Sequence, residues 1–145
     1  MKISTKGRYA LRMLLYLAEH RNCGYIALKE IAERQNISKK YLEQIIPIFN
    51  GSGILKTNRG SQGGYQLADS PDKYTVGAIL RLTEGSLAPT VCAEKNYAEC
   101  NRSGDCAMLP VWQGLYRVIN EYLDGITLQD IIDNYREHSA NDYVI

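Results

Sequence analysis

Long hydrophobic runs are absent from this chain of 145 residues. No stretch approaches the roughly 18 apolar residues that a membrane-spanning helix needs. The N-terminus also lacks a signal-peptide pattern, because Lys2, Lys6, Arg8 and Arg12 interrupt its apolar residues. We therefore expect a cytoplasmic protein with no membrane partner. In that compartment thiols stay reduced, and clustered cysteines more often indicate metal or redox chemistry than disulfides.

The signatures of common enzymes are missing as well. No pairing of a nucleophile with a base stands out, and no glycine-rich loop has the pattern that cradles phosphates. The sequence contains no internal repeat and no low-complexity tract. Its length is enough to bury a core and suggests one domain with an appendage. We predict that the protein is not an enzyme.

The net charge of +1 hides a strong asymmetry between the two halves of the chain. Residues 1–67 contain 11 Lys and Arg against 4 Asp and Glu, whereas residues 68–145 contain 6 against 12. A basic half joined to an acidic half suggests that only the first half meets a polyanion. The alternative is solvated surface charge that happens to be unevenly spread.

Apolar residues recur at three- and four-residue spacing in the basic half and predict three helices, over residues 5–20, 28–35 and 39–50. A tight turn over residues 36–38 separates the second from the third, and Ser38 is a good N-cap. Pro47 lies inside the third helix, where it removes one hydrogen bond and costs about 3 kcal/mol. We therefore expect a bend there or an early end to the helix.

Two short strands, over residues 54–58 and 65–67, flank a glycine-rich turn and predict a β-hairpin. Helix, tight turn, helix and glycine-tipped hairpin together give the order of a winged helix-turn-helix. The fold class that we expect is mainly α with a small β-hairpin wing. Residues 1–70 would form the DNA-binding domain.

In the second half, we expect a helix over residues 76–84 and a long helix from Pro110 to about Asp124, followed by a short helix over 128–134 with a frayed end. The long helix carries a wide apolar stripe that needs a partner surface. We favour a homodimer seam over packing within the same chain. Residues 71–145 would then be a sensor and dimerisation region, and helix 5–20 would also contribute to dimer packing.

The second helix of a helix-turn-helix pair lies in the major groove and exposes its N-terminal side chains to the edges of the bases. Glu accepts from a cytosine amino group, Gln pairs with adenine, and Lys meets guanine or phosphate. The wing would bring an Arg to the minor groove. The predicted DNA-binding residues are Lys39, Lys40, Tyr41, Glu43, Gln44, Arg59 and Gly60.

Three cysteines, Cys92, Cys100 and Cys106, lie in a polar segment that reads as a loop. A helix would spread them too far apart to share one small inorganic centre, whereas a loop can wrap three thiolates around it. Three thiolates and one other ligand can complete a two-iron cluster. The spacing lacks the two-residue gap of zinc knuckles, and a closed zinc site would need a fourth ligand.

Several motifs resemble the Rrf-two family of bacterial regulators. They are residues 1–11 (MKISTKGRYAL), residues 41–44 (YLEQ), and Arg59-Gly60 followed by Gly63-Gly64-Tyr65. The start of the helix at Thr75-Val76-Gly77 and the pair Thr127-Leu128 fit the same pattern. The resemblance covers nearly the whole chain. It implies a homodimeric winged-helix transcription factor whose base-reading positions fall on Glu43, Gln44 and Arg59. Position 40, a serine in the best-known member, is a lysine here.

Within that family, the three-cysteine loop is similar to that of the IscR-like regulators of iron–sulfur cluster assembly. The resemblance implies a two-iron two-sulfur cluster on Cys92, Cys100 and Cys106. Leu109 stands where such members have a histidine ligand, and Arg8 stands where some relatives place an acidic ligand from the partner subunit. The remaining candidates for a fourth ligand are Glu94, Glu99 or Asp105, or else an exogenous thiol or water.

The predicted function is that of a sequence-specific transcriptional regulator, a repressor that binds double-stranded operator DNA and senses cluster status. One alternative keeps DNA binding and drops the cluster. The loop would then be a thiol switch or would bind a cysteine-metabolism enzyme, as in regulators of the CymR kind. A second alternative is a small iron–sulfur redox protein that recognises no operator.

Overall fold

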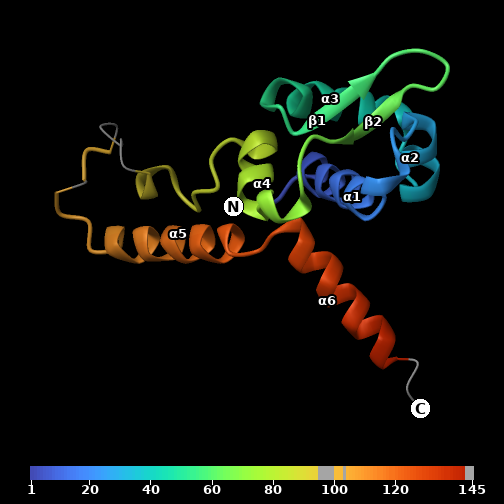
Figure 1. Ribbon diagram of the computed structural model, residues 1–145. Coiled ribbons are helices and arrows are strands. Elements are labelled where there is room, and N and C mark those ends of the chain that lie inside the picture. Colours follow the sequence, from blue (N-terminus) through green and yellow to red (C-terminus); the bar gives the residue numbers. More distant parts are fainter. Residues whose placement is uncertain (95–99, 103, 143–145) are drawn as a thin grey trace.

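Six α-helices and one antiparallel hairpin make up the part of the chain that the computed structural model describes, which is residues 1–94, 100–102 and 104–142 (Figure 1). The helices are α1 (Thr5–Glu19), α2 (Leu28–Gln35), α3 (Lys39–Ser52), α4 (Val76–Glu84), α5 (Leu109–Asp124) and α6 (Leu128–Asn141). The strands are β1 (Leu55–Asn58) and β2 (Gly64–Leu67), and short 3-10 turns η1, η2 and η3 cover Arg21–Cys23, Pro71–Lys73 and Val91–Ala93. Within the described ranges, no helix is long and apolar enough to cross a bilayer.

Helix α1 is the centre of the main core. Its buried residues Ala10, Met13, Leu14 and Leu17 follow the spacing of one helical face, and they meet fully buried side chains of α2 and α3. The same core includes Ile79 of α4 and Leu128 and Ile132 of α6. Each large apolar side chain that is fully buried contributes roughly 1.5–3 kcal/mol to folding. The predicted mainly α fold with a β-hairpin wing is confirmed.

The predicted turn between α2 and α3 is also present. Asn36 adopts a left-handed conformation at φ 51°, Ile37 is buried, and the Ser38 side chain accepts a hydrogen bond from the backbone N–H of Tyr41 at 3.1 Å. An asparagine tolerates this conformation at low cost, and a serine satisfies a free N–H group at the start of α3. The turn therefore fixes the direction of α3 relative to α2.

Of the two alternatives expected at Pro47, an early end of the helix is wrong, and so is the expected end of the last helix near residue 134. Helix α3 continues through Pro47 to Ser52, because Ile46 and Phe49 on either side of the proline are anchored in the core and outweigh its local cost. Helix α6 runs to Asn141 instead of ending near residue 134. Its start has a capping box between Thr127 and Asp130, and the helix continues for more than two turns beyond its last buried residue, Ile132.

Helix α5 has two apolar stripes with different surroundings. Tyr116, Ile119 and Leu123 pack against the buried Val76, Leu80 and Leu87 of the α4 region. The second stripe remains 43–67% exposed and consists of Val111, Leu115, Val118 and Tyr122, which we call the α5 stripe. The helix is therefore attached to its own chain along one side and leaves a second side uncovered.

Candidate nucleic-acid interface

The start of α3 presents polar side chains to solvent. Lys39, Lys40, Glu43 and Gln44 are all exposed, whereas the opposite side of the helix is buried in the core. Lys39 Nζ lies 4.0 Å from Glu43 Oε1, in a pair whose side chains are 60% and 55% exposed. Such an exposed pair contributes at most about 1 kcal/mol, so either partner is available to another ligand.

Tyr41 differs from the other predicted reading residues. Its side chain is half-buried, and its ring meets that of Tyr9 in α1 edge to face, with the centroids 5.3 Å apart. The guanidinium of Arg12 lies over the other ring, 5.5 Å from the centroid of Tyr9, and also donates to the carbonyl of Gln35. The structure therefore places Tyr41 in a packing contact that holds the start of α3 against α1.

The hairpin is fastened to the body of the protein. Its strands pair from Leu55 with Leu67 to Asn58 with Gly64, and Tyr65 exchanges two backbone hydrogen bonds of 2.9 Å with Ile26. A side chain at Gly64 would overlap the backbone of Ile26, so this close approach requires glycine. The turn that carries Arg59 and Gly60 is exposed beyond the strands.

A hollow of about 430 Å³ lies between the start of α2, the start of α3 and the wing. Lys29, Lys39 and Arg59, from three different elements, all line it, and so does Gly60. The structure thus brings together three of the predicted residues, Lys39, Arg59 and Gly60. Lys29 was missed, although its position at the start of the first helix of the pair, in the basic half, could have indicated it. Its amine lies 3.9 Å from Glu33 Oε1 in an exposed pair.

The three cysteines of the loop lie in different surroundings. Cys92 is half-buried in η3 with its sulfur 3.2 Å from Thr90 Oγ1, Cys106 is half-buried just before α5, and Cys100 is exposed. Among the residues that the structure describes, no three His, Cys, Asp or Glu side chains come together as a metal site. The thiolates have the chemistry that an iron–sulfur cluster needs, but the described arrangement does not assemble them around one.

The candidates for a fourth ligand that the structure describes also form no such group of three with the cysteines. Glu94 contacts the hydroxyl of Ser86, and Asp105 is exposed. Glu99 lies outside the described residues. Two positions carry a ligand in relatives but not here. Arg8 is exposed and donates to Thr5 Oγ1 at 3.0 Å, and Leu109 is the first residue of α5.

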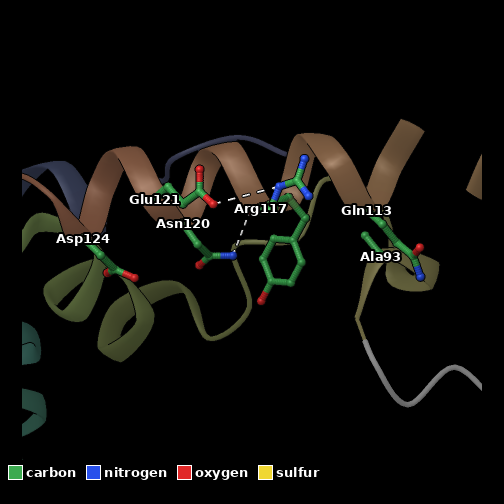
Figure 2. A pocket seen from close by; sticks show the side chains of 7 residues that line it. Ala93, Gln113, Arg117, Asn120, Glu121 and Asp124 are labelled. Atoms are coloured by element: carbon green, nitrogen blue, oxygen red, sulfur yellow. Dashed lines mark hydrogen bonds and ion pairs between the residues drawn. The ribbon is translucent and has the colours of Figure 1, made fainter. Parts of the chain in front are cut away.

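A groove that the sequence did not indicate runs along α5 beside η3 (Figure 2). Its volume is about 740 Å³, and its lining residues are Ala93, Gln113, Tyr116, Arg117, Asn120, Glu121 and Asp124. Arg81 of α4 donates to both carboxylate oxygens of Asp124 at 2.8 Å and to Asn120 Oδ1 at 2.5 Å. The hydrogen bonds that Arg81 donates to Asp124 lower the pKa of this carboxyl group below its ordinary value.

Comparison with known proteins agrees with this geometry. The family model Rrf2, described as an iron-dependent transcriptional regulator, matches residues 3–134. A putative HTH-type transcriptional regulator of Neisseria meningitidis is 38% identical over 92% of this chain and 88% of its own length. The structure of CymR, the global cysteine regulator of B. subtilis, is 36% identical with a TM-score of 0.75, covering 92% of this chain and 98% of that one.

IscR of T. potens is similar to the same degree. It is 38% identical with a TM-score of 0.76, covering 95% of this chain and 90% of that one. The family match and the winged helix-turn-helix geometry point to the same class of protein. The chain belongs to the Rrf2 family of transcriptional regulators.

Proposed function

We propose that the protein is a repressor that binds a specific operator as a homodimer and reads it with α3 and the wing. The observation that carries this proposal is the hollow in which Lys29, Lys39 and Arg59 converge from three elements beside the exposed start of α3. Cations gathered around a concavity suit the phosphates of a duplex, which supply most of the affinity of such proteins. In this proposal the protein acts in the cytoplasm and is a regulator, not an enzyme.

Some of these side chains would contact the bases of the duplex, and others would contact its backbone. Glu43, Gln44 and Lys40 on the exposed side of α3 would reach base edges in the major groove. Lys29 and Lys39 would hold phosphates, and Arg59 with Gly60 at the tip of the wing would approach the minor groove. In this proposal residues 1–70 are the DNA-binding domain.

The homodimer is proposed from the α5 stripe. Val111, Leu115, Val118 and Tyr122 follow one another at spacings of four, three and four, which is the repeat of a helix seam between two chains. A second copy of the same helix would cover these side chains. Residues 71–145 would thereby serve as the sensor and dimerisation region.

Selection of bound sequences from a randomised duplex pool tests the DNA-binding proposal. The selected operator should bind the wild-type protein at least about a thousandfold more tightly than random duplex. Arg59→Ala and Gln44→Ala should weaken this binding, whereas Gln129→Ala on the distant α6 should not. Failure to select any sequence would argue against operator recognition and in favour of the redox-protein alternative. So would Arg59→Ala and Gln44→Ala variants that bind the operator as tightly as the wild-type protein.

We further propose that Cys92, Cys100 and Cys106 hold an iron–sulfur cluster, a two-iron two-sulfur centre, whose presence the protein reports to its operator. The support is the donor set of three thiols in one short segment, together with the similarity to IscR of T. potens. Anaerobic reconstitution should give iron and acid-labile sulfide in equal amounts. Each of the three Cys→Ala changes should abolish them, and Cys23→Ala, in η1, should leave them intact.

A cluster-free regulator is the second candidate, because the three thiols do not converge in the described residues and CymR of B. subtilis is equally similar. The loop would then act as a thiol switch or as the binding site of a cysteine-metabolism enzyme. Reconstituted protein without iron and sulfide, whose operator affinity nevertheless responds to thiol oxidation or to such an enzyme, would favour this candidate.

A further inference from the structure

The last residue of α4 touches the first turn of α1. Glu84 Oε1 accepts two hydrogen bonds from Ser4, one from the hydroxyl at 2.5 Å and one from the backbone N–H at 3.2 Å. The Ser4 hydroxyl in turn accepts from the backbone N–H of Gly7 at 3.1 Å. We call this arrangement the Ser4–Glu84 clamp. Its carboxylate lies at the positive end of α1, where a negative charge is favoured.

Gly7 is the third member of this contact. A Cβ placed on Gly7 would overlap Glu84 Oε1 and would come within 3.2 Å of Leu80 Cδ2. The carboxylate therefore occupies the volume that any other residue at position 7 would fill. This close approach gives a physical reason for a glycine inside the first turn of an otherwise favourable helix.

Helix α4 has a second polar attachment, one turn earlier and directed at α5. Arg81 binds both carboxylate oxygens of Asp124 and also Asn120, as described above. A forked contact of this kind fixes direction as well as distance. Helix α4 is thus fastened to α1 through Glu84 and to α5 through Arg81.

These two attachments join the part of the protein that reads DNA to the part that carries the α5 stripe. Helix α1 shares its core with α2 and α3, and its Tyr9 packs on Tyr41 at the start of α3. Apolar packing, such as that of Ile79, also holds α4 in place, but burial of apolar surface has little directional preference. Hydrogen bonds to charged groups are shorter and directional, and they resist rotation of one helix on another.

We propose that Ser4, Glu84 and Arg81 are positioning residues that set the separation and the relative orientation of the two reading surfaces of the dimer. The inference rests on the proposed function, because it requires two copies that bind one operator. Each base pair added between two half-sites moves them about 3.4 Å further apart and turns them by about 35° around the duplex. If the two reading surfaces are rigidly connected, binding to operators with altered spacing is weakened. If the connection is flexible, these operators bind nearly as well as the native one.

The test compares operators that differ in spacing alone. The selected half-sites are placed at their native separation, one base pair closer and one base pair further apart, and a duplex with a single half-site is included. The wild-type protein should prefer the native spacing by about tenfold or more, which is within the range of coupling between two binding sites. Glu84→Ala should reduce this preference to about threefold or less, while its affinity for the single half-site stays within about twofold of wild type.

Three further variants make the test specific. Ser4→Ala should reproduce the loss, and the double change should be no worse than either single one, because both remove the same contact. Glu121→Ala is the matched control, since its carboxylate pairs with Arg117 of the same helix at 3.9 Å and does not join α4 to α1. If Glu84→Ala does not fold, Ser4→Ala takes its place, because it removes the hydroxyl that donates to Glu84.

The outcomes separate this inference from the proposed function. Wild-type spacing preference in Glu84→Ala, or in Ser4→Ala if Glu84→Ala does not fold, would overturn the inference. So would an equal loss for the single half-site, or a wild-type protein that is indifferent to spacing. A wild-type protein that fails to distinguish the half-site from random duplex would instead contradict the proposed function itself, and the inference would fall with it.

Discussion

Tyr9 and Tyr41 lie edge to face, with their ring centroids 5.3 Å apart and their planes at 75°. The pair joins α1 to the first turn of α3, the end that presents Lys39, Lys40, Glu43 and Gln44 to solvent. Edge-to-face contact places the positive rim of one ring on the negative face of the other. The orientation of the DNA-reading end of α3 therefore depends on α1 as well as on the turn before it.

The two tyrosines should be energetically coupled. In a double-mutant cycle with Tyr9→Ala and Tyr41→Ala, we expect a coupling of roughly 0.5–1.5 kcal/mol in the free energy of unfolding, beyond the area that each ring buries. Urea unfolding of the four proteins measures it. Tyr25→Ala, at an exposed position, serves as the control partner for Tyr41→Ala. Simple additivity of the Tyr9 and Tyr41 changes would show that the contact does not hold α3.

Base-reading and phosphate-binding residues should respond differently to substitution. Gln44→Ala should relax preference at one base pair by about 1–3 kcal/mol and leave the salt dependence unchanged, because the amide binds a base edge. Lys29→Ala and Lys39→Ala should each weaken binding to all sequences alike and reduce the slope of log affinity against log salt by about 0.9. Titrations at several salt concentrations measure both effects. An unchanged slope in Lys29→Ala would remove this residue from the interface.

Replacing Pro47 should stabilise the protein. The proline lies inside α3, where its ring nitrogen cannot donate to the carbonyl of Glu43, and the helix continues past it only because flanking side chains are buried. We expect Pro47→Ala to raise the free energy of unfolding by roughly 1–3 kcal/mol. Thermal and urea unfolding measure the change. A loss of stability would mean that the proline makes a native contact that outweighs the missing hydrogen bond.

The contact between Arg81 and Asp124 should give stability a defined dependence on pH. Hydrogen bonds from Arg81 lower the pKa of Asp124, so the folded protein favours the charged carboxylate. Its contribution is therefore complete above the ordinary pKa of about 3.9 and is lost as the pH falls through the lower pKa of the folded state. Because the side chains of Arg81 and Asp124 are 36% and 44% exposed, we expect the contribution to stay below about 1 kcal/mol.

Urea unfolding of wild type and Asp124→Asn from pH 7 to pH 2 measures this contribution. The difference between the two proteins should be largest at neutral pH and should shrink toward zero at the acid end. The same comparison in an Arg81→Ala background should show no such decline. A wild-type difference that stays constant over the whole range would contradict the assignment of the shift to Arg81.

The α5 stripe should control association. Leu115→Glu places a charge at the middle of the stripe, where two copies would meet, and should convert a dimer to a monomer at micromolar concentrations. Gln113→Glu adds the same charge on the side of α5 that lines the groove and should leave the dimer intact. Light scattering after size exclusion gives the mass of each protein. Equal masses for Leu115→Glu and wild type would place any interface elsewhere.

Much of the fold could be predicted from local patterns. The spacing of Ala10, Met13, Leu14 and Leu17 indicates the buried face of α1, and Asn36 with Ser38 indicates the turn before α3. These features depend on side chains within one or two turns of each other. Helix ends were less predictable, because the packing of Phe49 overrides Pro47 and because α6 extends beyond its last buried residue.

The site was predictable only in part. Lys39, Arg59 and Gly60 were chosen from motif positions and do line one hollow, whereas Lys29 joins them only through the packing of α2 against the wing. The half-burial of Tyr41 and the contact of Ser4 with Glu84 depend on residues 32 and 80 positions away. No local pattern carries that information. The sequence likewise identifies the three thiols that could bind a cluster, but it does not show how the loop positions them relative to one another.

Hydroxyl-radical footprinting of the selected operator tests the central claim most directly, because it records where the backbone of the duplex is covered. The account predicts two protected half-sites whose centres are one helical turn, about 10 base pairs, or a multiple of it apart. Protection should be lost from both half-sites together in Arg59→Ala. A single protected segment, or uniform reactivity along the operator at low salt, would contradict a dimer that binds DNA with α3 and the wing.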